Sequence, residues 1–199
     1  LGDWLGIGQL RGGTLGGGYW ASGNTYSGNG AAEFFKECYQ RLPAGDFAYL
    51  YRADSGFFVG ALMDLLDRGG HGYLIKVKLR GLAQLLAQQH WTPIRHQPGW
   101  EQCEFQYQAN DWKAPRFFLA VRQRKEAEGY PWQTELLELE HYEYFCYVTT
   151  EPLSPWQAHR AYGARATSET WIEEAKGQMG LAHVKTDHFL ANAALFQCA

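Results

Sequence analysis

The chain has 199 residues and a mass of 22.6 kDa, which allows one domain or one domain that carries a large insertion. Its 46% hydrophobic and 16% aromatic residues provide enough apolar surface for a core, which excludes a disordered or collagen-like chain. The net charge of −3 argues against a simple basic nucleic-acid binder. No run approaches the roughly 20 uncharged apolar residues of a transmembrane helix, and no signal-peptide pattern begins the chain. We therefore expect a soluble intracellular protein.

Glycine dominates the start of the chain. The first thirty residues contain 11 of the 23 glycines, and they keep neither a helical nor an alternating period. We expect loop or weak strand in this segment. The pattern then predicts a helix over 31–42, capped by Asn29, and a short strand over 47–51.

The next segments alternate helix and strand. A helix is predicted over 59–68, a strand over 73–78 and a short helix over 82–89. Because the connections between these elements are short, the pattern indicates an α/β layer structure.

After residue 90 the pattern changes to the polar–apolar alternation that is typical of antiparallel strands. The predicted strands are 103–108, 116–124, 134–140 and 142–149. A long helical stretch over 153–179 and a last helix over 187–197 follow. We predict three parts, which are an α/β core over 1–90, a β-rich insertion over 91–150, and carboxyl-terminal helices over 151–199 that complete the core.

Several familiar motifs are missing from the sequence. The cysteines lie far apart without a Cys-x-x-Cys pair, which favours buried free thiols over a zinc site or disulfides. The seven histidines show no His-Glu-x-x-His spacing, and the sequence contains neither a Gly-x-Ser-x-Gly turn nor a phosphate-binding loop. The tryptophans of the β-rich segment are expected to anchor its core, with stacking on DNA bases as the alternative.

Charge is divided unevenly along the second half of the chain. Residues 76–125 hold nine Lys or Arg and three acids, whereas residues 126–151 hold seven Glu and no Lys or Arg. The basic block is a candidate surface for a polyanion, with Arg122, Arg124 and Lys125 at its end. The alternative is that two oppositely charged strands pair with each other, and the charges alone do not decide between the two.

Asp54 is the first candidate for a chemical role. It directly follows a predicted strand, in a turn that begins with Ser55 and Gly56. Ligands and metals bind at the carboxyl ends of strands in α/β sheets, so a carboxylate here could hold a metal. Asp-Ser-Gly is also an ordinary turn in which Asp caps the following helix, and that interpretation stays open.

A second group of candidates shares one helix face. Four residues at offsets of 0, 3, 7 and 14 project within roughly 60° of one another, because each helical residue turns by about 100°. They are Tyr162, Arg165, Glu169 and Lys176. Such a face could bind a metal through the carboxylate and phosphates through the two cations. The alternative is a solvated face with ion pairs between successive turns.

The spacing of these four residues resembles the signature of one large branch of the DDE transposases of bacterial insertion sequences. That signature is Tyr, two residues, Arg, three residues, Glu, six residues and Lys, and the chain keeps every spacing. Residues 144–150 resemble the strand that precedes this helix in the family, and residues 187–194 resemble its closing helix. Segments 22–34 and 52–58 resemble those that carry the second catalytic Asp. The resemblance covers about residues 19–199.

The resemblance implies a ribonuclease H-like catalytic fold, incomplete at the amino terminus, with a β-rich insertion before the last catalytic helix. It implies two divalent ions, Mg²⁺ or Mn²⁺, held by an Asp-Asp-Glu triad in which Asp54 matches the second Asp and Glu169 the Glu. Arg165 and Lys176 would hold transposon-end phosphates, and Tyr162 would orient a phosphate or a neighbouring side chain. The implied partners are transposon-end and target DNA, in a homo-oligomer of the full-length protein located at the bacterial nucleoid.

The first Asp of the triad is the main departure from the family pattern. It should precede Tyr19 on the central strand, and Asp3 is a poor candidate because no β-type run leads into it. We therefore expect a carboxyl-terminal fragment that does not cut DNA by itself. The alternative function is that of a non-catalytic transposase remnant that binds DNA or regulates a full-length partner.

Overall fold

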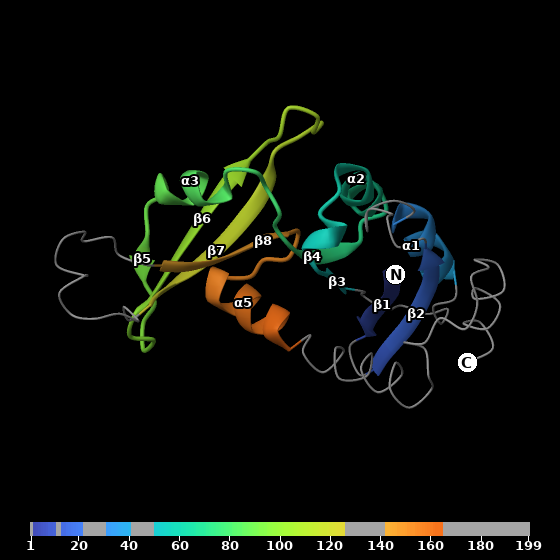
Figure 1. The fold of residues 1–199 in the computed structure, drawn as a ribbon, viewed down its shortest axis with the longest axis horizontal. Coiled ribbons are helices and arrows are strands. Elements are labelled where there is room, and N and C mark those ends of the chain that lie inside the picture. Colours follow the sequence, from blue (N-terminus) through green and yellow to red (C-terminus); the bar gives the residue numbers. More distant parts are fainter. Residues whose placement is uncertain (1, 11–12, 22–30, 41–49, 126–141, 165–199) are drawn as a thin grey trace.

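The structure is a computed structural model, and it describes residues 2–10, 13–21, 31–40, 50–125 and 142–164 (Figure 1). These residues form an α/β fold, as predicted, and their strands belong to one mixed sheet, which the sequence did not predict. The strands are β1 (Gly2–Leu10), β2 (Gly13–Ala21), β3 (Leu50–Ala53), β4 (Gly72–Lys76), β5 (Thr92–Pro93), β6 (Trp100–Tyr107), β7 (Arg116–Arg124) and β8 (Tyr142–Thr149). The helices are α1 (Ala31–Gln40), the 3-10 helix η1 (Ser55–Phe57), α2 (Gly60–Arg68), α3 (Leu82–Ala87) and α5 (Pro155–Gly163).

The sheet has the strand order β2-β1-β3-β4-β8-β7-β6-β5. β3 and β4 are parallel, and every other neighbouring pair is antiparallel. β1 and β2 pair along their whole length, and within the described residues β1 meets β3 at one register pair, Gln9 with Leu50. The glycine-rich start is therefore strand wherever the structure describes residues 2–21. The prediction for this segment was loop or weak strand, and the structure shows the second of these.

Helices cover the sheet on both faces. One hydrophobic cluster joins the sheet to α1, α2 and α3, and a second joins the other face to α5. Tyr73 and Ile75 of β4 belong to the first cluster, whereas Leu74 between them belongs to the second. Because successive strand residues point to opposite faces, a strand that is buried on both sides reads as one continuous apolar run. Figure 1 shows α3 and α5 on opposite sides of β7.

Most predicted elements are confirmed where the structure describes them. β7 and β8 have the predicted bounds, and α2, α3 and β6 differ from the prediction by one to three residues at an end. α1 begins at Ala31 as predicted, and the last two residues of that predicted helix are outside the described ranges. β3 overlaps the strand predicted over 47–51, whose first residues are outside the described ranges. The strand predicted over 134–140 and the helix over 187–197 also fall outside the described ranges, as does the predicted 153–179 stretch after residue 164.

The β-rich segment continues the sheet of the α/β core. β8 pairs with β4, and β7, β6 and β5 follow in order. Cys103 and Cys146 lie within these strands as buried free thiols, and Trp112 packs in the core, as predicted. Burial raises the pKa of the Cys103 thiol to about 12, so it stays protonated at neutral pH. No helix within the described ranges is long and apolar enough to cross a membrane.

Candidate active site

Asp54 lies directly after β3, where the prediction placed it. It is the amino-terminal cap of η1, and its Oδ1 accepts a hydrogen bond from the backbone N–H of Gly56 at 2.8 Å. The capping interpretation of Asp-Ser-Gly is therefore confirmed, but it uses only one of the two carboxylate oxygens. Asp54 is half-buried, and within the described residues Oδ2 accepts no hydrogen bond. The second oxygen remains available to a ligand.

The alternation of side chains along β3 shows on which face of the sheet Asp54 lies. Tyr51 and Ala53 belong to the cluster under α1 and α2, whereas Leu50 packs with the cluster under α5. Side chains two residues apart in extended chain lie on one face, and Asp54 has an extended backbone with φ −77° and ψ −179°. Arg52 and Asp54 therefore lie on the α5 side.

Arg52 connects β3 directly to α5. Its side chain is buried, and Nη1 donates a hydrogen bond to the backbone carbonyl of Ala161, which is in the last turn of α5. The contact joins residues that are 109 positions apart in the sequence. No motif predicted it, because the sequence does not show which helix covers which face.

α5 begins where the sequence places a strong start signal. The Ser154 side chain accepts from the N–H of Gln157, the Gln157 side chain accepts from the N–H of Ser154, and Pro155 occupies the first turn. This capping box satisfies two backbone N–H groups that a helix start leaves without partners. The helix predicted from Leu153 is thus confirmed at its beginning.

Aromatic contacts hold α5 against β6 and β8. His159 Nδ1 and the Tyr147 hydroxyl are 2.9 Å apart, and the His159 ring lies 5.1 Å from Trp100. Tyr162, one of the predicted site residues, packs its ring 4.9 Å from that of Tyr147. The side chain of Tyr162 is therefore half-buried against the sheet. Any contact that it makes with DNA has to come from its exposed part.

The other residues of the predicted signature are outside the described ranges. These are Arg165, Glu169 and Lys176. Glu169 follows Ala164, the last described residue of this segment, by five positions, and five residues span at most about 17 Å. The structure therefore does not place Glu169 relative to Asp54, and its role as a ligand stays a prediction.

Asp54 fits a divalent ion as one ligand of a larger set. Mg²⁺ prefers oxygen ligands, and a half-buried carboxylate with one open oxygen at a strand end provides one. Within the described ranges, no group of three or more His, Cys, Asp or Glu residues lies close enough to hold an ion. Further carboxylates would have to come from other parts of the chain, and Glu169 is the sequence-predicted one.

Arg122 and Lys125, which were predicted to bind DNA, have acidic partners within the chain. Arg122 donates from Nε to Oε2 of Glu101 at 2.6 Å, and its guanidinium lies 3.9 Å from the Tyr142 ring centre. Burial alone would lower the pKa of Arg122, but its hydrogen bonds, that to Glu101 foremost, raise it. Lys125 lies 3.3 Å from Glu143 on β8, with both side chains about half exposed. Pairing of the basic block with the acidic run, the alternative interpretation, is thus present at Lys125 and Glu143, whereas Glu101 belongs to the basic block itself.

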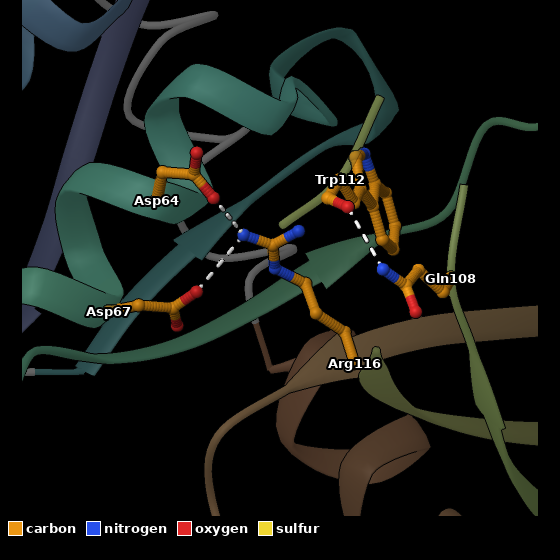
Figure 2. A network of polar contacts seen from close by, with 5 residues as sticks. All are labelled: Asp64, Asp67, Gln108, Trp112 and Arg116. Atoms are coloured by element: carbon orange, nitrogen blue, oxygen red, sulfur yellow. Dashed lines mark hydrogen bonds and ion pairs between the residues drawn. The ribbon is translucent and has the colours of Figure 1, made fainter. Parts of the chain in front are cut away.

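Sequence reasoning missed a buried charge cluster between β7 and α2. Arg116 belongs to the basic block, yet its side chain is only 6% exposed. Its Nη2 donates to Oδ1 of Asp64 at 2.5 Å and to Oδ2 of Asp67 at 3.0 Å, and its guanidinium stacks on Trp112 (Figure 2). The available signal was a pair of acids three residues apart on a helix that is otherwise apolar up to its last residue, Arg68.

The electrostatics of this cluster agree with its geometry. Burial lowers the pKa of Arg116, but hydrogen bonds to the two carboxylates outweigh that effect and raise it. Nε and Nη1 are buried without a hydrogen-bond partner. Burial, with Asp67 nearby, raises the pKa of Tyr73 to about 12. The cluster attaches the β-rich strands to the helix that follows Asp54 and η1.

Comparison with known proteins agrees with the motif assignment. The family model for "Transposase DDE domain group 1" matches residues 19–198, a range that includes Asp54 and the complete Tyr-Arg-Glu-Lys spacing. Curated protein sequences gave no match to the chain. Because the family model covers far more than half of the 199 residues, the chain belongs to the DDE transposase domain family, group 1.

Proposed function

We propose that this member of a DNA transposition family uses a ribonuclease H-like domain, with residues 91–150 as its insertion, to cut transposon ends and join them to target DNA with Mg²⁺ or Mn²⁺. The observation that supports this proposal is the position of Asp54 at the end of β3, on the α5 side, with one carboxylate oxygen that is not used in capping η1. Glu169 is the proposed second ligand. The signature spacing from Tyr162 supports the choice of Glu169.

The proposed chemistry explains why carboxylates are needed. Cleavage of a phosphodiester and its joining to a 3′-hydroxyl are both in-line displacements at phosphorus. In such reactions, two hard cations held by carboxylates activate the attacking oxygen and stabilise the negative charge on the leaving oxygen. Asp54 and Glu169 would hold that charge in place, and Arg165 and Lys176 would bind the flanking phosphates. Tyr162, whose ring packs on Tyr147, would hold in place the helix proposed to carry Arg165 and Lys176.

DNA is also proposed to contact the end of the basic block. Lys125 supports this because its side chain is 58% exposed and its pairing with Glu143 is therefore weak. Arg122 and Arg124 belong to the same proposed surface, although Arg122 is already bound to Glu101. We further propose that the protein acts as a homo-oligomer on paired transposon ends, at the nucleoid in the bacterial cytoplasm.

The proposed metal site can be tested by Mn²⁺ binding, measured as the loss of the free-ion electron paramagnetic resonance signal. Asp54→Asn should lower the Mn²⁺ affinity of the 199-residue chain strongly, while leaving its binding to transposon-end DNA and its unfolding temperature nearly unchanged. Equal Mn²⁺ binding by Asp54→Asn and wild type would refute the site.

Nicking of transposon-end DNA tests the activity of the chain itself. With Asp54 and Glu169 as the only assigned carboxylates, an ion would be poorly held, because Mg²⁺ gives up its waters reluctantly. We therefore expect no robust nicking by the 199-residue chain. Robust Mg²⁺-dependent nicking that disappears in Asp54→Ala would show that the chain supplies a third ligand.

A further inference from the structure

Lys76 is the last residue of β4, and it lies beside Asp54 at the same edge of the sheet. β3 and β4 are parallel and Ala53 pairs with Ile75, so Asp54 and Lys76 occupy the next positions along the two strands. The backbones of neighbouring strands are about 5 Å apart. The carboxyl ends of these two parallel strands, where α/β sheets bind ligands, therefore carry one carboxylate and one ammonium.

The side chain of Lys76 lies on the α5 face of the sheet, the face on which Asp54 lies. Ile75 belongs to the cluster under α1, α2 and α3, whereas Leu74 packs with the cluster under α5. Since Lys76 follows Leu74 by two residues in a strand, the two share one face. Burial lowers the pKa of His159 on α5 and the charge of Lys76 adds to this effect, which agrees with an ammonium on that face.

The Lys76 ammonium has no counter-charge in the part of the chain that the structure describes. The residue is half-buried, yet its ammonium forms no hydrogen bond or ion pair with any described residue, Asp54 included. Its register partner on β8 is Tyr147, whose hydroxyl is already bound to His159. Because a charge that is partly removed from water is costly without a partner, this place favours a bound anion.

Resting on the proposed function, we propose that Lys76 binds a phosphate oxygen of the DNA backbone next to the ion held by Asp54. A phosphodiester oxygen is attracted by both the ion and the ammonium, and lysine contacts phosphate as a point charge. In the absence of DNA, Lys76 and the ion repel each other because both are positive. In the absence of the ion, the Asp54 carboxylate repels the phosphate. Lys76 therefore weakens binding of the ion alone and strengthens binding of DNA together with the ion.

Two binding measurements on the 199-residue chain test this role without relying on DNA cutting. Lys76→Met should raise the Mn²⁺ affinity of the DNA-free chain about fivefold, because it removes a like charge close to the ion. The second quantity is the ratio of the affinity for a duplex oligonucleotide with Mn²⁺ to that without Mn²⁺. In Lys76→Met this ratio should fall about tenfold, because a hydrogen bond from a charged donor is worth about that factor. The resonance signal of free Mn²⁺ and the fluorescence anisotropy of labelled DNA measure the two affinities.

Two further variants separate phosphate binding from general effects of charge and stability. Lys76→Arg keeps the positive charge, so both quantities should stay near those of the wild type. Lys36→Met is the matched control, since it removes the same charge from an exposed position on α1, which packs on the opposite face of the sheet. It should change neither quantity. A purely structural role of Lys76 would instead make Lys76→Met bind both Mn²⁺ and DNA less tightly.

The outcomes distinguish this inference from the proposed function. Tighter Mn²⁺ binding by Lys76→Met with an unchanged affinity ratio for DNA would overturn the phosphate contact and leave the metal site intact. Weaker Mn²⁺ binding by Lys76→Met would also overturn the contact, because loss of structure would then explain the effect. Equal changes in Lys36→Met would overturn it as a general effect of charge. Equal Mn²⁺ binding by wild type and Asp54→Asn would refute the proposed metal site, and the role of Lys76 with it.

Discussion

Removing the two carboxylates that hold Arg116 should destabilise the protein more than removing Arg116 itself. The side chain of Arg116 is 6% exposed, whereas those of Asp64 and Asp67 are 24% and 40% exposed. In Asp64→Ala/Asp67→Ala the guanidinium is left buried without a counter-charge, while in Arg116→Met the two carboxylates can turn toward water. The loss of unfolding free energy is therefore larger when the charge left without a partner is the buried guanidinium, which cannot reach water.

The magnitudes follow from this asymmetry. Breaking a buried pair from one side costs about 3–5 kcal/mol, and two Asp→Ala changes in a helix return up to about 1 kcal/mol, so the double variant should lose about 3 kcal/mol. Arg116→Met loses charged hydrogen bonds but also removes Nε and Nη1, which are buried without partners, so its net cost should be about 1 kcal/mol. The triple variant should therefore be more stable than the double variant.

Urea unfolding followed by tryptophan fluorescence measures these differences, provided that the dependence on urea stays the same among the variants. The control is Lys125→Met, which removes a half-exposed pair and should change the unfolding free energy by less than about 1 kcal/mol. A larger loss in Arg116→Met than in the double variant would refute the reasoning. Further destabilisation on adding Arg116→Met to the double variant would refute it as well.

Three more predictions concern the site, the basic block and the helix contact. Glu169→Gln should abolish Mn²⁺ binding in the resonance assay, whereas Glu173→Gln should lower the Mn²⁺ affinity far less and Glu174→Gln should leave it almost unchanged. Loss of Mn²⁺ binding in Glu173→Gln together with retained binding in Glu169→Gln would show that the signature alignment is wrong. Neutralising Arg122, Arg124 and Lys125 together should lower the slope of log affinity for duplex DNA against log salt by up to about 0.9 per lost contact, and an unchanged slope would assign these charges to intramolecular pairing alone. Burial, with Lys76 nearby, lowers the pKa of His159 below 6.5, so the unfolded state takes up the proton first as the pH falls; wild type should lose more unfolding free energy than His159→Phe between about pH 7.5 and 5.5, and parallel pH profiles would contradict this.

Local structure was largely predictable because local rules decide it. β7 and β8 have the predicted bounds, since their apolar runs are long and turn residues or polar residues end them. The start of α5 follows from Ser154, Pro155 and Gln157, whose capping contacts span only three residues. Asp54 was placed correctly at a strand end for the same reason, because Ser55 and Gly56 make the turn.

Charge could be counted in the sequence but its location could not. Arg116 and Lys125 belong to the same basic block, yet one is buried in a pair with α2 and the other is half exposed. Burial depends on which helix covers which face, and periodicity within one element does not contain that information. The acidic pair of Asp64 and Asp67 became meaningful only once β7 was placed beside α2.

The amino-acid sequence by itself determined the family, the helices and strands, and the strand-end position of Asp54, because these depend on residues close together along the chain. Only the tertiary structure decided that β8 pairs with β4, and that α5 covers the face shared by Arg52 and Asp54. These contacts join residues more than 70 positions apart, and their free energy comes from burying two apolar surfaces together. A pattern in either segment alone predicts an apolar face without predicting its partner.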